Sequence, residues 1–197
     1  MSGIMDMVIG SLGTGAVDKI SQNLNIDKEK ASVAVSGAVP MLVTALAKNA
    51  EDKGGAESLL KALEKDHDGS VLDNVDGYLD GAKTQAGAKI LKHVLGEQEG
   101  VVEKGLGKLA GLDKSQVAGV LATLAPLVLG AISKNTSKEG LDVGGLTDLL
   151  KSESKAAEKK APDAMGVLGK LLDADGDGEI GDDVASVGMK LLSSFLK

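Results

Sequence analysis

The chain has 197 residues, a formal charge of −7, 43% hydrophobic residues and 26% charged residues. These are the proportions of a globular protein, and they exclude wholesale disorder. The absence of cysteine excludes disulfides and thiol catalysis. A nucleic-acid binder needs a basic face, often with stacking aromatics. Tyr78 and Phe195 are the only aromatics in this acidic chain, so we expect no nucleic acid as a partner.

The first part of the chain predicts two short helices. Residues 1–12 are apolar and should form a helix that docks on the rest of the protein. They lack a basic leader and include Asp6 within the apolar run, so we expect no signal peptide and a cytoplasmic protein. Residues 16–24 follow with Val17, Ile20 and Leu24 on one helical face.

The most apolar stretch, residues 115–133, contains no charged residue and predicts a central core helix. Asp113 should cap its start, and Lys134-Asn135 should close its end. The stretch approaches the length of a membrane span, but its proline and glycines and the lack of an aromatic belt favour a buried core helix. We therefore predict no membrane span.

The same pattern occurs earlier in the chain, where Asp27 precedes an apolar stretch that ends in Ala-Lys-Asn. Pro40 and Pro126 occupy matching places in the two stretches, and each should kink or divide its helix. The sequence therefore predicts an internally duplicated all-α domain, with two related halves around a pair of apolar helices.

We place the boundary between the halves near residue 99. The first half, 1–99, contains a repeat over about 15–80 and a connector helix over 82–95. The second half, 100–197, adds a polar stretch over 151–162, which we interpret as a solvated helix extension or a mobile linker. An acidic loop over 173–183 follows, and an amphipathic segment ends the chain.

The acidic loop resembles an EF-hand calcium loop in its spacing. Carboxylates alternate with small residues, a glycine stands at the sixth position, and the seventh can offer a backbone carbonyl. The twelfth position is Val184, where a bidentate glutamate belongs, so the shell would have to close earlier. The alternative is a plain Asp-Gly turn with Asp182 as a helix cap. The predicted calcium ligands are Asp173, Asp175, Asp177, Glu179 through its carbonyl, and Asp182 or Asp183.

A second loop, 64–73, repeats the acidic pattern with weaker chemistry. Glu64, Asp66, Asp68 and Asp73 match the acidic positions, but Lys65 adds a positive charge. Whether this loop binds metal stays open. In the alternative, Gly69 makes a turn and Ser70 caps a helix that starts near Val71.

Several segments together resemble a large bacterial family of unknown function, DUF937, which is distantly related to YidB. The segments are ALAKNA, GGAESLLKAL with EKDHDGSVLDNV, GAKILKHVLG, and LDKSQVAGVLATLAPLVLGAISK. The resemblance extends from about residue 15 to 135, and the DADGDGEIGDD tail is also similar to members of the family. It implies an all-helical bacterial protein without an assigned activity.

These observations favour a non-enzymatic, calcium-binding helical scaffold or assembly protein. A calcium-responsive regulatory module is the first alternative, and an enzyme that uses the acidic loop is the second. His67 and His93 are the only histidines, and no nucleophile motif accompanies them, so we predict no catalytic residues. We expect self-association or a protein partner, because both terminal segments are amphipathic and need a surface to cover them. Docking within the chain would satisfy the same need.

Overall fold

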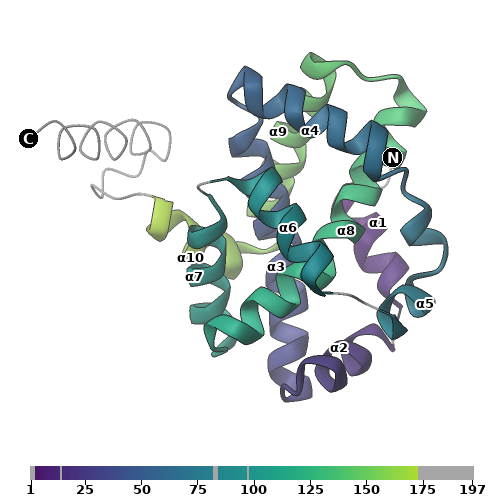
Figure 1. Cartoon of the computed structure of the whole chain (residues 1–197). Helices are drawn as coiled ribbons and strands as arrows, with labels where there is room; N and C mark the ends of the chain where they lie inside the picture. The colour runs from purple at the N-terminus through teal and green to yellow at the C-terminus, as the bar shows by residue number, and fades with distance from the viewer. Residues whose placement is uncertain (1–2, 14, 82–83, 97, 173–197) are drawn as a thin grey trace, which may run out of the picture.

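The computed structural model describes residues 3–13, 15–81, 84–96 and 98–172, and within these ranges it contains helices and no strand. The all-α prediction is confirmed. The elements shown in Figure 1 are α1 (Ile4–Leu12), α2 (Ala16–Leu24), α3 (Lys28–Asn49), α4 (Lys53–Asp66), the 3₁₀ helix η1 (Ser70–Asp73), α5 (Val75–Asp80), α6 (Thr84–Leu95), α7 (Gln98–Ala110), α8 (Lys114–Glu139), α9 (Val143–Lys160) and α10 (Pro162–Leu172).

The two helices with an internal proline, α3 and α8, form the centre of the molecule and pack on each other. Most of their side chains are buried, as their apolar sequences predict. Helix α3 is covered by α7 and α9, and α8 is covered mainly by α6. Neither Pro40 nor Pro126 divides its helix, so the alternative of a divided helix is wrong for both.

The ends of α8 are set by local hydrogen bonds. At the start, the Asp113 side chain accepts from the Gln116 backbone N–H while the Gln116 side chain accepts from the Asp113 N–H. The prediction that Lys134-Asn135 closes the helix is wrong, because α8 continues to Glu139. Gly140 ends it with a φ of 62°, a left-handed conformation that costs glycine little.

Glycines allow helices to approach closely in a core almost without aromatic residues. At Gly87 in α6, an added Cβ would overlap the backbone carbonyl of Ala122 in α8. At Gly37 in α3, it would overlap the side chain of Leu109 from α7. With glycine at these contacts the helices lie close together, so the core can be filled without large aromatic side chains.

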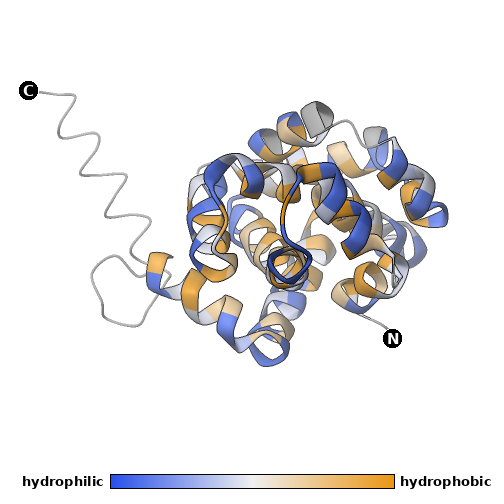
Figure 2. Ribbon diagram, turned by 90° about the horizontal axis from the view of Figure 1, so that it is seen from below, coloured by the Kyte–Doolittle hydropathy of each residue, from blue (hydrophilic) through white to orange (hydrophobic). Residues whose placement is uncertain are grey.

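The N-terminal helix and the polar stretch before α10 are both docked on the core. Helix α1 buries Ile4, Met5, Val8 and Leu12, so docking within the chain covers this terminal segment. The polar residues of 151–160 continue α9, so the expected helix extension is confirmed and the mobile linker is wrong. Figure 2 shows the result: the helices turn hydrophobic residues toward one another and hydrophilic residues outward.

Candidate functional site

The predicted calcium ligands Asp173, Asp175, Asp177, Glu179, Asp182 and Asp183 lie outside the described residues. The structure describes the helix before that loop, α10, which ends at Leu172. Helix α10 packs on α7 and α3, and Leu171 lies near Gly105 of α7.

The first loop, residues 64–73, is described and forms a tight turn between two helices. Helix α4 ends at Asp66, and Gly69 reverses the chain with a φ of 84°. The turn packs on α8, where Gly130 leaves room for Gly69 and Val71. The predicted helix from Val71 is instead η1 followed by α5. Asn74 caps α5, and its side chain accepts from the Gly77 backbone N–H at 3.0 Å.

Two carboxylates of the first loop, those of Asp68 and Asp73, have protein partners. Asp68 accepts from the backbone N–H of Ser70 at 2.9 Å, and the Ser70 hydroxyl and N–H lower the pKa of Asp68. Asp73 forms an ion pair with Lys134 of α8. Among the residues whose positions the structure gives, no group of three His, Asp or Glu side chains could hold a metal ion. The alternative of a turn built from Asp, Gly and Ser describes the geometry of this loop.

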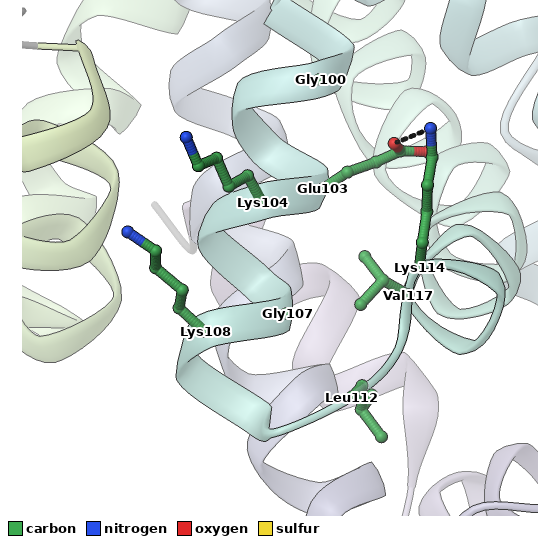
Figure 3. A pocket seen from close by; sticks show the side chains of 8 residues that line it. All are labelled: Gly100, Glu103, Lys104, Gly107, Lys108, Leu112, Lys114 and Val117. Carbon is green, nitrogen blue, oxygen red and sulfur yellow. Dashed lines mark ion pairs between the residues drawn. The ribbon is translucent and has the colours of Figure 1, made fainter.

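A surface cleft of about 490 Å³ lies between α7 and the start of α8 (Figure 3). Glu103 and Lys114 form an ion pair across it at 3.7 Å. Lys104 and Lys108 point from α7 to the side where α10 lies. All three lysines are exposed to solvent, so the cleft has a basic rim but no buried polar group that would fix a ligand.

A second hollow, which we call the α3 groove, has a volume of about 410 Å³ and an apolar lining. The two exposed large hydrophobic side chains in the described part of the chain, Ile9 at 55% and Val33 at 43%, both line it. Its floor is α3 and its walls come from α1, α7 and the junction of α9 with α10. The lining residues are Met5, Ile9, Ser32, Val33, Ser36, Gly37, Pro40, Leu109, Lys160, Ala161, Pro162, Asp163 and Ala164.

The α3 groove was not predicted from the sequence. In the sequence, the one available signal was Val33, an apolar residue that lies on the same stretch as the polar Ser32 and Ser36. In the structure all three are exposed. Periodicity identified the apolar face of α3, but which part of that face remains uncovered depends on where α1 and α10 pack.

Of the two histidines and the tyrosine, the structure describes the side chains of His67 and Tyr78. His67 caps the end of α4, and the side chain of His93 lies outside the described residues. Tyr78 donates its hydroxyl hydrogen to the carbonyl of Thr123 in α8 at 3.0 Å. Burial raises the pKa of Tyr78 to about 12, so it remains neutral and structural.

Helices α3 and α8 are long and apolar enough to cross a membrane, judged by length and composition. In each, 72% of the most apolar window is buried inside the fold. The core helix of a globular protein has the same properties, so these helices are weak evidence for a membrane span.

Comparison with known proteins identifies a family and no function. No curated protein and no solved structure matches the sequence. Residues 6–135 match the family described as bacterial protein of unknown function (DUF937), a range that runs from α1 into α8. Helices α9 and α10 and the acidic loop follow this range. The chain therefore belongs to the DUF937 family of bacterial proteins.

Proposed function

We propose that this protein is a non-enzymatic helical scaffold of two related halves and that its acidic loop, 173–183, binds one Ca²⁺. Asp173, Asp175 and Asp177 supply side-chain oxygens, Glu179 its carbonyl, and Asp182 or Asp183 closes the shell. Calcium takes six to eight oxygen ligands in flexible geometry, so a loop without the twelfth-position glutamate can still enclose it.

The order of the helices supports the internal duplication. In each half a short helix, α2 or α7, leads through an aspartate into a proline-containing helix, α3 or α8. The short helices also make reciprocal contacts. Leu24 of α2 packs at Gly119 of α8, and Leu109 of α7 packs at Gly37 of α3.

The observation that carries the calcium proposal is the helix–turn–helix geometry of the first loop. Gly69 reverses the chain between α4 and η1, at the position where the calcium-loop pattern places its invariant glycine. Gly178 occupies the matching place in the acidic loop. A similar turn there would bring alternate carboxylates to one side.

The two loops differ in how their negative charge is balanced. In the first loop, Ser70 and Lys134 satisfy Asp68 and Asp73, and Lys65 adds a further cation. The acidic loop contains six carboxylates and no lysine between residues 173 and 183. Carboxylates gathered at one point repel one another unless a cation joins them, and Ca²⁺ is the cation that matches oxygen ligands without nitrogen or sulfur.

Thermal unfolding with calcium and with EDTA tests the proposal. A ligand at a hundredfold excess over Kd stabilises the native state by about 2.7 kcal/mol, so calcium should raise Tm and EDTA should lower it. Magnesium should act less, because it demands a tighter octahedron. Asp177→Ala should abolish the difference between calcium and EDTA, whereas the matched control Asp68→Ala should keep it. Equal Tm values in calcium and EDTA would contradict calcium binding.

A calcium-responsive interaction module is the second candidate, and the position of α10 favours it. This helix begins in the α3 groove at Pro162 and ends where the acidic loop starts, so it connects the two features. Under EDTA a scaffold loses stability, whereas a responsive module keeps its fold and moves one element. Hydrogen exchange of α10, compared with that of α8, separates these outcomes.

Self-association and a cytoplasmic location are part of the same proposal. Helix α1 is covered within the chain, so self-association would have to use another surface than its apolar face. Light scattering that gives the mass of one chain, 19.9 kDa, over a wide concentration range would exclude self-association.

A further inference from the structure

The α3 groove lies at the place on α3 that corresponds to a covered place on α8. Proline has no backbone N–H, so Pro126 cannot donate to the carbonyl of Ala122 four residues earlier. Helix α6 packs at this point, with Gly87 against that carbonyl. Tyr78 of α5 bonds to the neighbouring Thr123 carbonyl. The chain that follows the first loop therefore covers the proline region of α8.

Pro40 creates the same situation on α3, where it cannot donate to the carbonyl of Ser36. Both Ser36 and Pro40 line the α3 groove, and the described part of the chain leaves this apolar region open. Val33, one turn before, is 43% exposed. If the two halves are related, the segment that follows the acidic loop is the counterpart of α5 and α6.

The sequence of that segment repeats α6. The run Gly-Ala-Lys-Ile-Leu, two further residues and Val-Leu in α6 corresponds to Gly-Met-Lys-Leu-Leu, two further residues and Phe-Leu near the end of the chain. Of the α6 residues whose side chains the structure describes, Gly87, Leu91 and Leu95 are buried, and Lys89 and Lys92 are exposed. The matching residues are Gly188, Leu192, Leu196, Lys190 and Ser193. The pattern of apolar and polar positions is therefore the same in both segments.

We propose that residues 184–196 form a helix that packs in the α3 groove of the same chain, as α6 packs on α8. Gly188 would then lie near the Ser36 carbonyl, and Leu192, Phe195 and Leu196 would cover Val33 and Ile9. This assignment gives the exposed apolar residues of the groove a partner of matching chemistry.

The length of the chain fits a return to the groove. Helix α10 starts in the groove and, at 11 residues, extends about 16 Å to Leu172. Residues 173–183 can reverse the direction, and a helix over 184–196 spans about 20 Å. If that helix runs back along α10, its end would lie at the level of Pro162 and Ala164. The short connection gives the segment a high effective concentration at its own groove, which favours it over a second copy.

This inference rests on the internal duplication in the proposed function and not on calcium. A plain turn over 173–183 would return the segment equally well. The docking and the metal can therefore fail separately.

The test uses a single tryptophan, because the natural chain has none. In the full chain, Phe195→Trp should give blue-shifted emission and low acrylamide quenching. The control Ser194→Trp, on the polar face, should give emission and quenching typical of a solvated side chain. Adding Val33→Glu to Phe195→Trp should shift the emission to the red and increase the quenching, since the charge would lie under the docked helix. Val33 is partly exposed, so the charge should leave the fold intact, and Gln22→Glu on exposed α2 is the matched control.

Equal quenching in the Phe195→Trp and Ser194→Trp variants would overturn the inference. It would also be overturned if the indole of Phe195→Trp were protected from quenching to the same extent with and without Val33→Glu. Protection that disappears on dilution, with light scattering from dimers, would assign the segment to a second copy and also overturn it. Protection that is independent of concentration and sensitive to Val33→Glu supports the inference. If that protection survives EDTA while no calcium binds, the docking stands and only the metal proposal fails.

Discussion

The two helices with an internal proline differ in what covers them. The region of α8 around Pro126 is sealed by α6 and Tyr78, whereas the matching region of α3 around Pro40 opens into a groove of about 410 Å³. The sequences of the two regions are similar enough to indicate equal helices. The difference shows that an apolar sequence pattern identifies the helix face that favours burial. Whether that face is buried depends on where the other helices pack.

Helices α3 and α8 also differ in how they begin. Asp113 forms a reciprocal capping box with Gln116, but the side chain of the matching Asp27 makes no cap hydrogen bond. Position 30, three residues after Asp27, is Lys30, which cannot accept a hydrogen bond as Gln116 does. Lys30 therefore accounts for the missing reciprocal bond at the start of α3.

The largest effect is expected at the contact that seals α8. Gly87→Ala would place a methyl group on the Ala122 carbonyl, and backbone cannot yield as a side chain can. Overpacking of this kind costs about 3 kcal/mol or more of the unfolding free energy. Gly10→Ala in α1 is the control, because nothing lies within 4 Å of an added Cβ there, and alanine should stabilise that helix by about 0.5–1 kcal/mol. Urea unfolding measures both; equal effects of the two substitutions would refute the close approach.

The hydrogen bond of Tyr78 contributes less. Tyr78→Phe should cost about 1 kcal/mol near neutral pH through the loss of the bond to Thr123. Because burial raises the pKa of Tyr78 to about 12, the neutral side chain stabilises the fold below the ordinary tyrosine pKa near 10. That contribution is lost as the pH rises through the folded pKa, and we expect it to be about 1–2 kcal/mol after allowance for partial exposure.

The pH effect is measured as the difference in unfolding free energy between the natural chain and Tyr78→Phe. The difference should shrink from about pH 9 to about pH 12, because the phenylalanine variant lacks the titrating group. A constant difference over this range would show that Tyr78 titrates normally.

The capping aspartates should differ in proportion to their hydrogen bonds. Asp113→Ala removes the bond that the Asp113 side chain accepts from the Gln116 N–H, and should cost about 1 kcal/mol. Asp27→Ala removes no cap bond and should cost only a few tenths of a kcal/mol. Thermal unfolding of the pair is the comparison, and equal losses would mean that the two helices begin in the same way.

The smallest effect is expected for the ion pair of the first loop. Lys134→Ala should cost about 0.5 kcal/mol, because the side chain of Asp73 is 68% exposed and that of Lys134 is 35% exposed. High salt should reduce the difference between Lys134→Ala and the natural chain. A loss that is large and independent of salt would indicate a role of Lys134 beyond the ion pair.

The sequence predicted the helical class and the positions of most helices, because the apolar periodicity of segments such as 16–24 and 115–133 is strong. It missed the end of α8. Lysine and asparagine are common at helix ends, but α8 continues past Lys134 and Asn135 and is capped by Gly140. It also missed Asn74 as the cap of α5, because the pair Ser70 and Asp73 offered a similar signal. The sequence offers two possible helix starts here, one at Ser70 and one at Asn74. The packing of the turn against Gly130 of α8 accompanies the start at Asn74.

The candidate site could be predicted only in part. Spacing predicts calcium ligands in the acidic loop, which lies outside the described residues and stays a prediction. The α3 groove arises from residues far apart in the chain, such as Ile9, Leu109 and Ala164. A pattern of neighbouring residues in the sequence cannot show that such distant residues lie together in the fold. The first loop shows a further limit of prediction from sequence. Its acidic spacing resembles that of the loop over 173–183, yet in the structure Asp68 is hydrogen-bonded to Ser70 and Asp73 is paired with Lys134.

Calorimetric titration of the metal-free protein with calcium tests the central claim most directly. The account predicts saturable heat with a stoichiometry of one, abolished by Asp177→Ala and retained by Asp68→Ala. The absence of heat up to millimolar calcium, or equal heat from the two variants, would contradict it.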